Sequence, residues 1–408
     1  DALLSRGLGD VYKRQGQVFA VSAQIVEEEI CSIEDVDRGA KVGLRWAEGP
    51  FEIANKIGIR ETIRMAKKYS ELAEFKLPKW MEEKEELFEF NYIDIDINGK
   101  IANIKLNRPE AMNALNESLV EQLGSALDSL NSRDDIETIV LEGAGKAFVA
   151  GADVKFFVDK IHEDAIKDIY EFTAYGHEVL NKLENSEKTT IALTTGLALG
   201  GGLELALSCD YRIGTRRSQF RFPETNIGIF PGLGGTQRMP RICGIEAARY
   251  AILAGNFLDS ETAFALGIIT HLVEPSDIPS LVDNVSILGK PENKYTGEPK
   301  DKNHPVSSFA MKFYKNENMS DIMSGNIPND FQMDDKKVIR QMKSLGFTAP
   351  IALNIANQLL NDAISTGDDL DKGLKLELDQ LDTIFGTKDA LEGLSALIEG
   401  RRPKYQNI

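Results

Sequence analysis

The sequence predicts an α/β fold for most of the chain, with helical segments before and after the α/β part. The first observation is a change of hydrophobic period near Tyr92, where apolar and polar residues begin to alternate. The second is the alternation of helix-like segments with short apolar strands in the residues that follow. The third is the return of a helical period over residues 349–408. A length of 408 residues is enough for two or three domains.

Residues 1–65 contain two predicted parts. Residues 1–15 begin with Asp and end in Val-Tyr-Lys-Arg-Gln, which resembles translated sequencing-adapter read-through. We expect them to be a non-native leader, with the native protein beginning near Gly16 as a fragment whose upstream part is missing. Residues 16–65 have the apolar spacing of helices, a Ser32–Asp35 capping box and a helix stop at Gly49-Pro50. They are predicted to form a small all-helical domain.

The middle of the chain is predicted to hold a linker and then the α/β domain. Residues 66–89 are charged and contain Pro78, so we expect a linker. Residues 90–280 are expected to form the α/β domain, which opens with a hairpin around the Asn98-Gly99 turn. The later elements are predicted from periodicity: helices at 115–131, 163–184 and 203–208, and strands at 138–142 and 190–194.

The last third of the chain has two compositions. Residues 281–345 are rich in Lys, Asn, Asp and Pro, which predicts a polar insertion or a loosely ordered connection. Residues 346–408 return to helix and are expected to complete the α/β domain. Four apolar residues mark one helix face there: Leu353, Ala356, Leu359 and Leu360.

Composition limits the classes of function. A net charge of −17 argues against nucleic acid or an anionic membrane as the main partner. No apolar run approaches the roughly 18–20 residues that cross a bilayer, so we expect a soluble protein. The three cysteines are widely spaced, which favours a reducing cytoplasm over a disulfide framework. The four histidines are scattered, so no metal site is expected.

Three glycine-rich segments carry the candidate chemistry: residues 146–155, 196–207 and 222–238. In the second, glycines open an apolar helix whose first N–H groups are suited to hold a developing oxyanion. Glu204 follows among leucines, where an unpaired charge is costly and the pKa rises. A solvent-facing glutamate is the alternative. Likewise, Gly151 and Asp153 alone fit a turn and a helix N-cap, and the third segment alone fits a rigid turn.

Together, these segments resemble the enoyl-CoA hydratase (crotonase) family over about residues 91–274 and again over 349–408. The resemblance implies a ClpP/crotonase-like ββα spiral fold. It implies that the backbone N–H groups of Ala152 and Gly201 form an oxyanion hole for the thioester carbonyl, and that Glu204 and Glu224 act on one water. It further implies contacts with the substrate or its CoA part from Ala111, Met112, Lys146, Ala150, Asp153, Val154, Gly200, Pro223 and Gly232.

The expected reaction is hydration of the 2,3 double bond of a 2-enoyl-CoA. One carboxylate deprotonates water and a carboxylic acid protonates the α-carbon. We assign Glu224 as proton donor and Glu204 as base, and exchange of the two roles stays open because a coupled pair titrates as a unit. The resemblance also implies a homo-trimer or a hexamer. No cofactor is expected beyond the CoA of the substrate.

Residues 33–52 resemble the helical carboxy-terminal domain of 3-hydroxyacyl-CoA dehydrogenases. The whole chain beyond residue 15 therefore resembles the end of a dehydrogenase–hydratase fusion. A Gly-x-Gly-x-x-Gly between a strand and a helix is absent from the sequence, so we expect no NAD binding. Two other functions remain open: an enoyl-CoA isomerase on the same fold, and a non-catalytic acyl-CoA-binding fragment.

Overall fold

The computed structural model describes residues 2–408, with side chains from residue 14 onward. The chain divides into two compact units, one up to Asn91 and one from Tyr92 to Ile408. In the described part of the chain, no helix is long and apolar enough to span a membrane.

The first unit is all-helical, as expected for residues 16–65. Its helices are α1 (Ala2–Glu27), α2 (Ile33–Gly43), α3 (Pro50–Ile57), α4 (Ile59–Ala73) and α5 (Lys79–Glu82). Ser32 caps α2, since its side chain accepts a hydrogen bond from the Asp35 N–H, which confirms the predicted helix start. Helix α1 runs across the domain boundary expected at Gly16.

The segment expected to be a linker, residues 66–89, differs from that expectation. It contains the second half of α4 and all of α5, and Leu77, Met81 and Phe88 are buried in the core of the first unit. Phe88 packs on Phe51, with ring centroids 4.7 Å apart. The linker prediction rests on the high charge of the segment. Burial of its few apolar side chains stabilises it as part of the first unit.

Two sheets organise the second unit. The larger has the strand order β1-β2-β3-β5-β7-β10, and the smaller has the order β4-β6-β8-β9. The predicted hairpin is confirmed, because β1 (Ile93–Asn98) pairs antiparallel with β2 (Ile101–Leu106) in the register Ile95↔Ile104. The remaining strands are β3 (Thr138–Gly143), β4 (Ala147–Ala150), β5 (Thr189–Thr194), β6 (Leu197–Leu199), β7 (Tyr211–Gly214), β8 (Gln219–Arg221), β9 (Leu258–Asp259) and β10 (His271–Leu272).

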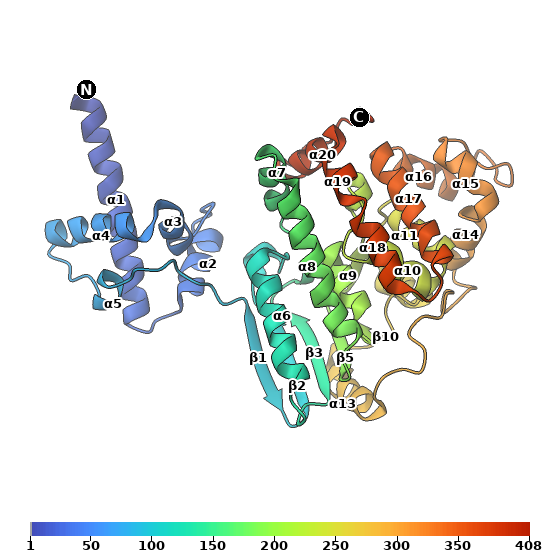
Figure 1. Cartoon of the computed structure of the whole chain (residues 1–408), viewed down its shortest axis with the longest axis horizontal. Helices are drawn as coiled ribbons and strands as arrows, with labels where there is room; N and C mark the ends of the chain where they lie inside the picture. Colours follow the sequence, from blue (N-terminus) through green and yellow to red (C-terminus); the bar gives the residue numbers. More distant parts are fainter. Residues whose placement is uncertain (1) are drawn as a thin grey trace. The chain divides into compact units, whose positions relative to one another are not determined.

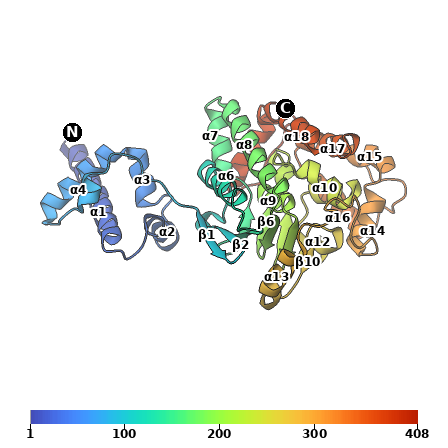
Figure 2. The same cartoon turned by 60° about the horizontal axis from the view of Figure 1, so that its bottom comes forward.

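Helices cover the sheets. Up to β10 these are η1 (Pro109–Ala111), α6 (Glu117–Asn131), α7 (Val154–His162), α8 (Ile166–Glu184), α9 (Gly201–Ser208), η2 (Glu224–Ile227), α10 (Gly235–Cys243), α11 (Ile245–Ile252) and α12 (Ser260–Leu266). The three helices predicted from periodicity correspond to α6, α8 and α9. Figure 1 shows α6 and α8 beside the larger sheet, and Figure 2 shows α9 next to β6.

Residues 281–345, expected as a polar insertion or a loosely ordered connection, contain helices. After η3 (Pro275–Asp277) they hold most of α13 (Ile278–Leu288), and then α14 (Pro305–Phe313), α15 (Asn316–Met323) and α16 (Lys336–Leu345). Phe313 and Tyr314 are fully buried. The buried Arg249 donates to Tyr314 O at 2.8 Å, which fixes α14 to the domain. The polar composition of this segment concealed a cluster of aromatic residues. Burial of their rings offsets the conformational entropy that the segment loses when it becomes ordered.

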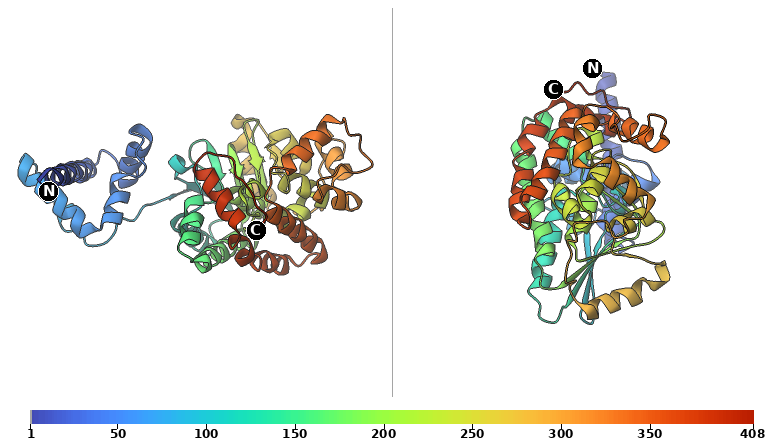
Figure 3. Two further views of the ribbon diagram at one scale, coloured as in Figure 1. Left: turned by 90° about the horizontal axis from the view of Figure 1, so that it is seen from above. Right: turned by 90° about the vertical axis from the view of Figure 1, so that its right-hand side faces the viewer.

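The chain ends in α17 (Pro350–Ser365), α18 (Leu370–Leu378), α19 (Leu381–Phe385) and α20 (Lys388–Ile398). The predicted apolar face of α17 is confirmed, since Leu353, Ala356, Leu359 and Leu360 are buried. Figures 1 and 3 show α18–α20 in red beside the green helices α7 and α8, whereas α17 packs against α10 and α11. Residues of α19 and α20 line the cavity at the carboxyl ends of β4, β6 and β8, where the candidate site lies.

Candidate active site

Three parallel strands end at one edge and bring the predicted glycine-rich segments together. Strand β4 pairs with β6 and β6 pairs with β8, in the register Ala150↔Leu199↔Arg221. Ala150 and Leu199 lie within the first two predicted segments, and the third segment begins directly after Arg221. The carboxyl ends of neighbouring parallel strands are a common position for a ligand site, because the loops there meet at one edge.

Two backbone N–H groups at this edge are oriented by local structure. Leu115 N–H donates to Gly151 O at 2.9 Å, and Asp153 N–H donates to Leu115 O at 2.8 Å. Because backbone groups alternate along an extended chain, the Ala152 N–H between them points away from Leu115. Gly201 is the first residue of α9, where an N–H has no partner within the helix.

Glu204 lies in the first turn of α9 with only 1% of its surface exposed. Its Oε1 accepts hydrogen bonds from the N–H groups of Leu233 and Gly235, both at 2.7 Å. Burial, together with the charges of Glu224 and Glu377, raises the pKa of Glu204 well above its ordinary value. The two N–H donors act in the opposite direction and favour the ionised form.

Glu224 opens η2 and is 7% exposed. Burial raises the pKa of Glu224 to about 8. Among the described residues, its buried Oε2 has no hydrogen-bond partner. Its Oε1 occupies the space that a Cβ on Gly200 would take, and Gly200 has a φ of +48°. Both the positive φ and the lack of space for a Cβ require glycine at position 200. Glu204 Oε2 lies near the next residue, Gly201.

A buried carboxylate from the C-terminal helices holds the loop over Glu204. Glu377 of α18 is fully buried and accepts a hydrogen bond from the Gly234 N–H at 2.5 Å and one from the Thr236 hydroxyl. His177 Nε2 lies 2.7 Å from Gly232 O and 3.5 Å from Glu377 Oε1. Since a carbonyl oxygen only accepts, Nε2 carries the hydrogen. The loop from Gly232 to Thr236 is therefore held by hydrogen bonds with both His177 and Glu377.

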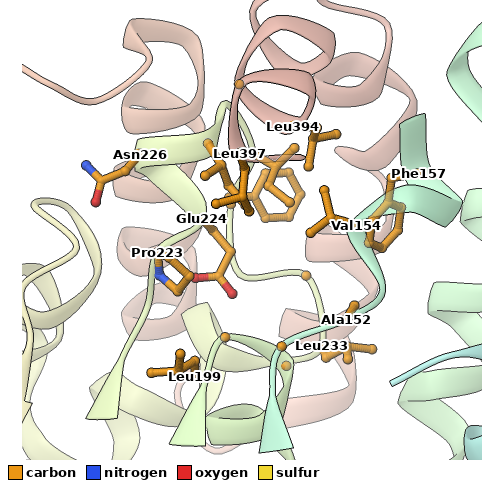
Figure 4. A pocket seen from close by; sticks show the side chains of 18 of the residues that line it. Ala152, Val154, Phe157, Leu199, Pro223, Glu224, Asn226, Leu233, Leu394 and Leu397 are labelled. Atoms are coloured by element: carbon orange, nitrogen blue, oxygen red, sulfur yellow. The ribbon is translucent and has the colours of Figure 1, made fainter. Parts of the chain in front are cut away.

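These groups surround a cavity of about 460 Å³. Figure 4 shows Glu224 at this cavity with Phe157 and Val154 from α7 and Leu394 and Leu397 from α20 around it. The lining is mostly apolar, as is typical of small-molecule sites with a few polar groups. The cavity thus places two buried carboxyl groups and two candidate N–H donors on one apolar space.

Most of the predicted site residues line this cavity. They are Met112, Ala150, Ala152, Val154, Gly200, Gly201, Glu204, Pro223, Glu224 and Gly232. Three others do not: Ala111 lies in η1, the Lys146 side chain is exposed, and Asp153 forms an ion pair with Arg108 at 3.0 Å. In the described part of the chain, no group of three or more His, Cys, Asp or Glu side chains is placed to hold a metal ion.

A sequence model described as enoyl-CoA hydratase/isomerase matches residues 101–407, which is most of the chain. The chain belongs to the enoyl-CoA hydratase/isomerase family. Its fold agrees with this assignment, because an enoyl-CoA hydratase from Rhodobacter sphaeroides superposes with a TM-score of 0.66 at 22% identity. That likeness covers 78% of this chain and 92% of the other.

Curated relatives of the family match the same part of the chain. Crotonyl-CoA hydratase of Syntrophomonas wolfei is 28% identical over 317 residues, which cover 78% of this chain and 98% of the relative. Short-chain-enoyl-CoA hydratase of Clostridium acetobutylicum is 28% identical over 315 residues, which cover 77% of this chain and 97% of the relative.

The sequence did not predict that α19 and α20 form part of the wall of this cavity. Leu381, Ile384 and Phe385 line the cavity and have the spacing of one helix face. Periodicity signals such a face, but it does not say which surface the face covers. Glu377 was missed for a similar reason, since its sequence context is that of an ordinary charged helix.

Proposed function

We propose that this chain adds water across the 2,3 double bond of a 2-enoyl-CoA thioester to give a 3-hydroxyacyl-CoA. The observation that carries the proposal is the pair of buried carboxyl groups, Glu204 and Glu224, on the two sides of the Gly200–Gly201 turn that opens α9. Family membership and the hydratase names of the two curated relatives support the same reaction class.

The carbonyl end of the substrate is proposed to bind at Ala152 and Gly201. Attack on the β-carbon of a conjugated thioester moves charge onto the carbonyl oxygen. Two N–H donors stabilise this enolate oxygen, and in acyl-transfer sites each is worth roughly 2.7–4 kcal/mol. The outward direction of the Ala152 N–H and the unpaired start of α9 support this role.

The water is proposed to lie between the two glutamates. Glu204 deprotonates it and Glu224 delivers a proton to the α-carbon. The N–H bonds from Leu233 and Gly235 favour the anion of Glu204 and so support its role as base. The unpartnered Oε2 and raised pKa of Glu224 support its role as acid.

The CoA part is proposed to extend from the cavity past Met112. Met112 is 46% exposed although it lines the cavity, so it lies at the rim. Its neighbour Asn113 is buried and holds the loop through Nδ2, which donates to the carbonyls of Ala144, Ala147 and Phe148. Ala111, Lys146 and Asp153 are proposed to contact CoA outside the cavity.

The test is a hydration assay with crotonyl-CoA that follows the loss of the conjugated thioester absorbance. Glu204→Gln and Glu224→Gln should each lower kcat at least about 100-fold, because general acid–base steps contribute roughly that much. KM should change little, because each change removes an interaction made mainly in the transition state. Glu178→Gln, at an exposed position of α8, is the matched control.

Near-parent turnover in either glutamine variant would exclude that residue from the reaction. An enoyl-CoA isomerase is distinguished by its substrate, since it converts a 3-enoyl-CoA without consuming water. Faster turnover of 3-hexenoyl-CoA than of 2-hexenoyl-CoA would assign the chain to that activity.

For residues 16–65 we propose kinship with the helical carboxy-terminal domain of 3-hydroxyacyl-CoA dehydrogenases, as in a dehydrogenase–hydratase fusion. The motif over residues 33–52 supports this. Its Asp37 is buried and accepts hydrogen bonds from the Phe51 and Glu52 N–H groups, both at 2.8 Å, so the motif has a structural role. No NAD binding is expected from this unit.

A homo-trimer or a hexamer is proposed from family resemblance, and light scattering of the purified chain tests it. We also propose a reducing compartment such as the cytoplasm. Cys31, Cys209 and Cys243 are free, and burial raises the pKa of the latter two thiols, which keeps them unreactive.

A further inference from the structure

A second cavity adjoins the catalytic one. It has a volume of about 740 Å³ and lies between the end of β8, the loop after α11 and the C-terminal residues. Arg221, Asn226 and Pro403 line both cavities, so one wall is common to the two. Arg221 and Asn226 lie within three residues of Glu224 in the chain, so this wall adjoins the proposed proton donor.

The charge of the second cavity is opposite to that of the chain. Two arginines, Arg221 and Arg402, are among its 14 lining residues, and no aspartate or glutamate is among those described. The chain as a whole has a net charge of −17. Both guanidinium groups lie over exposed rings: Arg221 is 4.7 Å from the Phe257 centroid, and Arg402 is 5.8 Å from that of Phe347. An aromatic ring orients a cation without neutralising it.

Arg221 is held in place by neutral groups. Its Nε donates to Gly255 O at 2.7 Å, and its Nη2 donates to Asn226 Oδ1 at 2.9 Å. Asn226 is itself fixed by the Tyr405 hydroxyl, which donates to Asn226 O at 2.6 Å. Within the described part of the chain, Arg221 forms no ion pair, and its Nη1 has no hydrogen-bond partner. A fixed, partly buried guanidinium with a free donor is a preorganised anion site.

Glu224 does not pair with the Arg221 guanidinium. Glu224 follows Arg221 by three residues and acts on its charge from a distance, but its proposed role requires it to be protonated. Arg401, which also lines the catalytic cavity, is neutralised by Glu392 and Glu399. Among the described residues that line the catalytic cavity, Arg221 is therefore the cation with an unused hydrogen-bond donor.

We propose that Arg221 binds a carboxylate at the far end of the acyl chain, so that the substrates include 2-enoyl-CoA esters of dicarboxylic acids. This rests on the proposed hydration, in which the thioester lies at Ala152 and Gly201 and the double bond at Glu204 and Glu224. The acyl chain then continues toward Arg221 at the shared wall, and Arg402 adds positive potential from the second cavity.

The test compares two substrates that differ only at the far end, 2-hexenedioyl-CoA and 2-hexenoyl-CoA. The readout is the ratio of their kcat/KM values. We expect the unmodified chain to favour the dicarboxylic substrate at low salt. Arg221→Leu should lower the ratio about 10- to 100-fold, the effect of losing a charge-assisted hydrogen bond. Arg221→Lys should lower it less, since the charge remains.

Two controls separate this effect from others. Arg216→Leu, at an exposed position paired with Glu274, should leave the ratio unchanged. Raising NaCl from about 0.02 to 0.5 M should lower the ratio for the unmodified chain but not for Arg221→Leu, because salt screens a charge pair. The loss of Arg221 also changes the pKa of Glu224, because the two charges interact. That change affects the turnover of both substrates equally and therefore cancels in the ratio.

A folded Arg221→Leu protein that hydrates 2-hexenoyl-CoA with an unchanged ratio would overturn the proposal. If that variant does not fold, a salt-independent ratio in the unmodified chain overturns it instead. Failure of the unmodified chain to hydrate crotonyl-CoA and 2-hexenoyl-CoA would be a different result, because it would refute the hydration itself.

Discussion

Glu204 and Glu224 differ in what their oxygen atoms contact, and this difference supports the separate roles proposed for them. Glu204 receives two backbone N–H bonds on one oxygen, whereas Glu224 Oε2 has no partner among the described residues. Two carboxylates in one apolar space do not both ionise at neutral pH. Burial and the charges of Glu224 and Glu377 raise the pKa of Glu204 as well, but the two N–H bonds favour its ionised form. We therefore propose that the proton resides on Glu224, as the proposed reaction requires.

The activity should therefore fall in alkaline solution. The pKa of Glu224 is raised to about 8, so Glu224 keeps its proton below that pH and loses it above. We expect kcat/KM for crotonyl-CoA to decrease as pH rises through about 8. A pH–rate profile measures this, and the alkaline limb should be absent from the residual activity of Glu224→Gln. A limb that persists in that variant would belong to another group.

The same shift predicts an effect on stability. The folded-state pKa of Glu224 lies above the ordinary value of 4.5, so its stabilising contribution is full below pH 4.5 and is lost as pH rises toward 8. Glu224→Gln should thus melt higher than the parent at pH 8, and this advantage should shrink at pH 5. Equal melting temperatures at pH 8 would contradict the shift.

At the scale of elements, the position of α18 determines the shape of the site. Glu377 joins this helix to the loop over Glu204, through hydrogen bonds to Gly234 and Thr236. Its charge also raises the pKa of Glu204. A residue 143 positions after Gly234 in the sequence thereby affects the position and basicity of the proposed base.

Glu377→Ala should loosen that loop. It leaves the buried Gly234 N–H without an acceptor, which costs about 1–3 kcal/mol, and it should lower kcat and raise KM for crotonyl-CoA. Glu377→Gln keeps one acceptor and should recover part of the activity. Steady-state kinetics and melting curves measure both variants. Equal activity of the alanine variant and the parent would show that the loop needs no support from α18.

In the first unit, the packing of α3 against α2 depends on Asp37, which accepts the N–H groups of Phe51 and Glu52 at the start of α3. Asp37→Ala removes both acceptors and should destabilise this unit by about 2 kcal/mol. Faster hydrogen exchange in α2 and α3 would report it. Crotonyl-CoA hydration should be unaffected, because the described residues that line the cavity all belong to the second unit.

At the scale of the whole molecule, the described residues that line the catalytic cavity all lie between Tyr92 and Ile408. We expect a protein of residues 92–408 to fold and to hydrate crotonyl-CoA with kcat/KM within about threefold of the full chain. The boundary at residue 92 falls just before the first strand, so no sheet is cut. A folded but inactive protein of residues 92–408 would show that the first unit takes part in the reaction.

The sequence alone determined the α/β class, the hairpin, the helix start at Ser32 and the residues that open α9. These features have local causes: period, turn residues and caps act within a few positions. The three glycine-rich segments identify the family because their residue types follow one another in a set order. Each is also held locally, at the end of its own strand.

Only the tertiary structure decided which distant residues complete the site. Glu377, the apolar wall of α19 and α20, and the free donor of Arg221 all depend on packing between segments far apart in the chain. The same holds for residues 66–89 and 281–345, whose charge and polarity concealed the few apolar side chains that anchor them. Periodicity shows that a face must be buried, whereas the partner of that face is set by the shape of the whole domain.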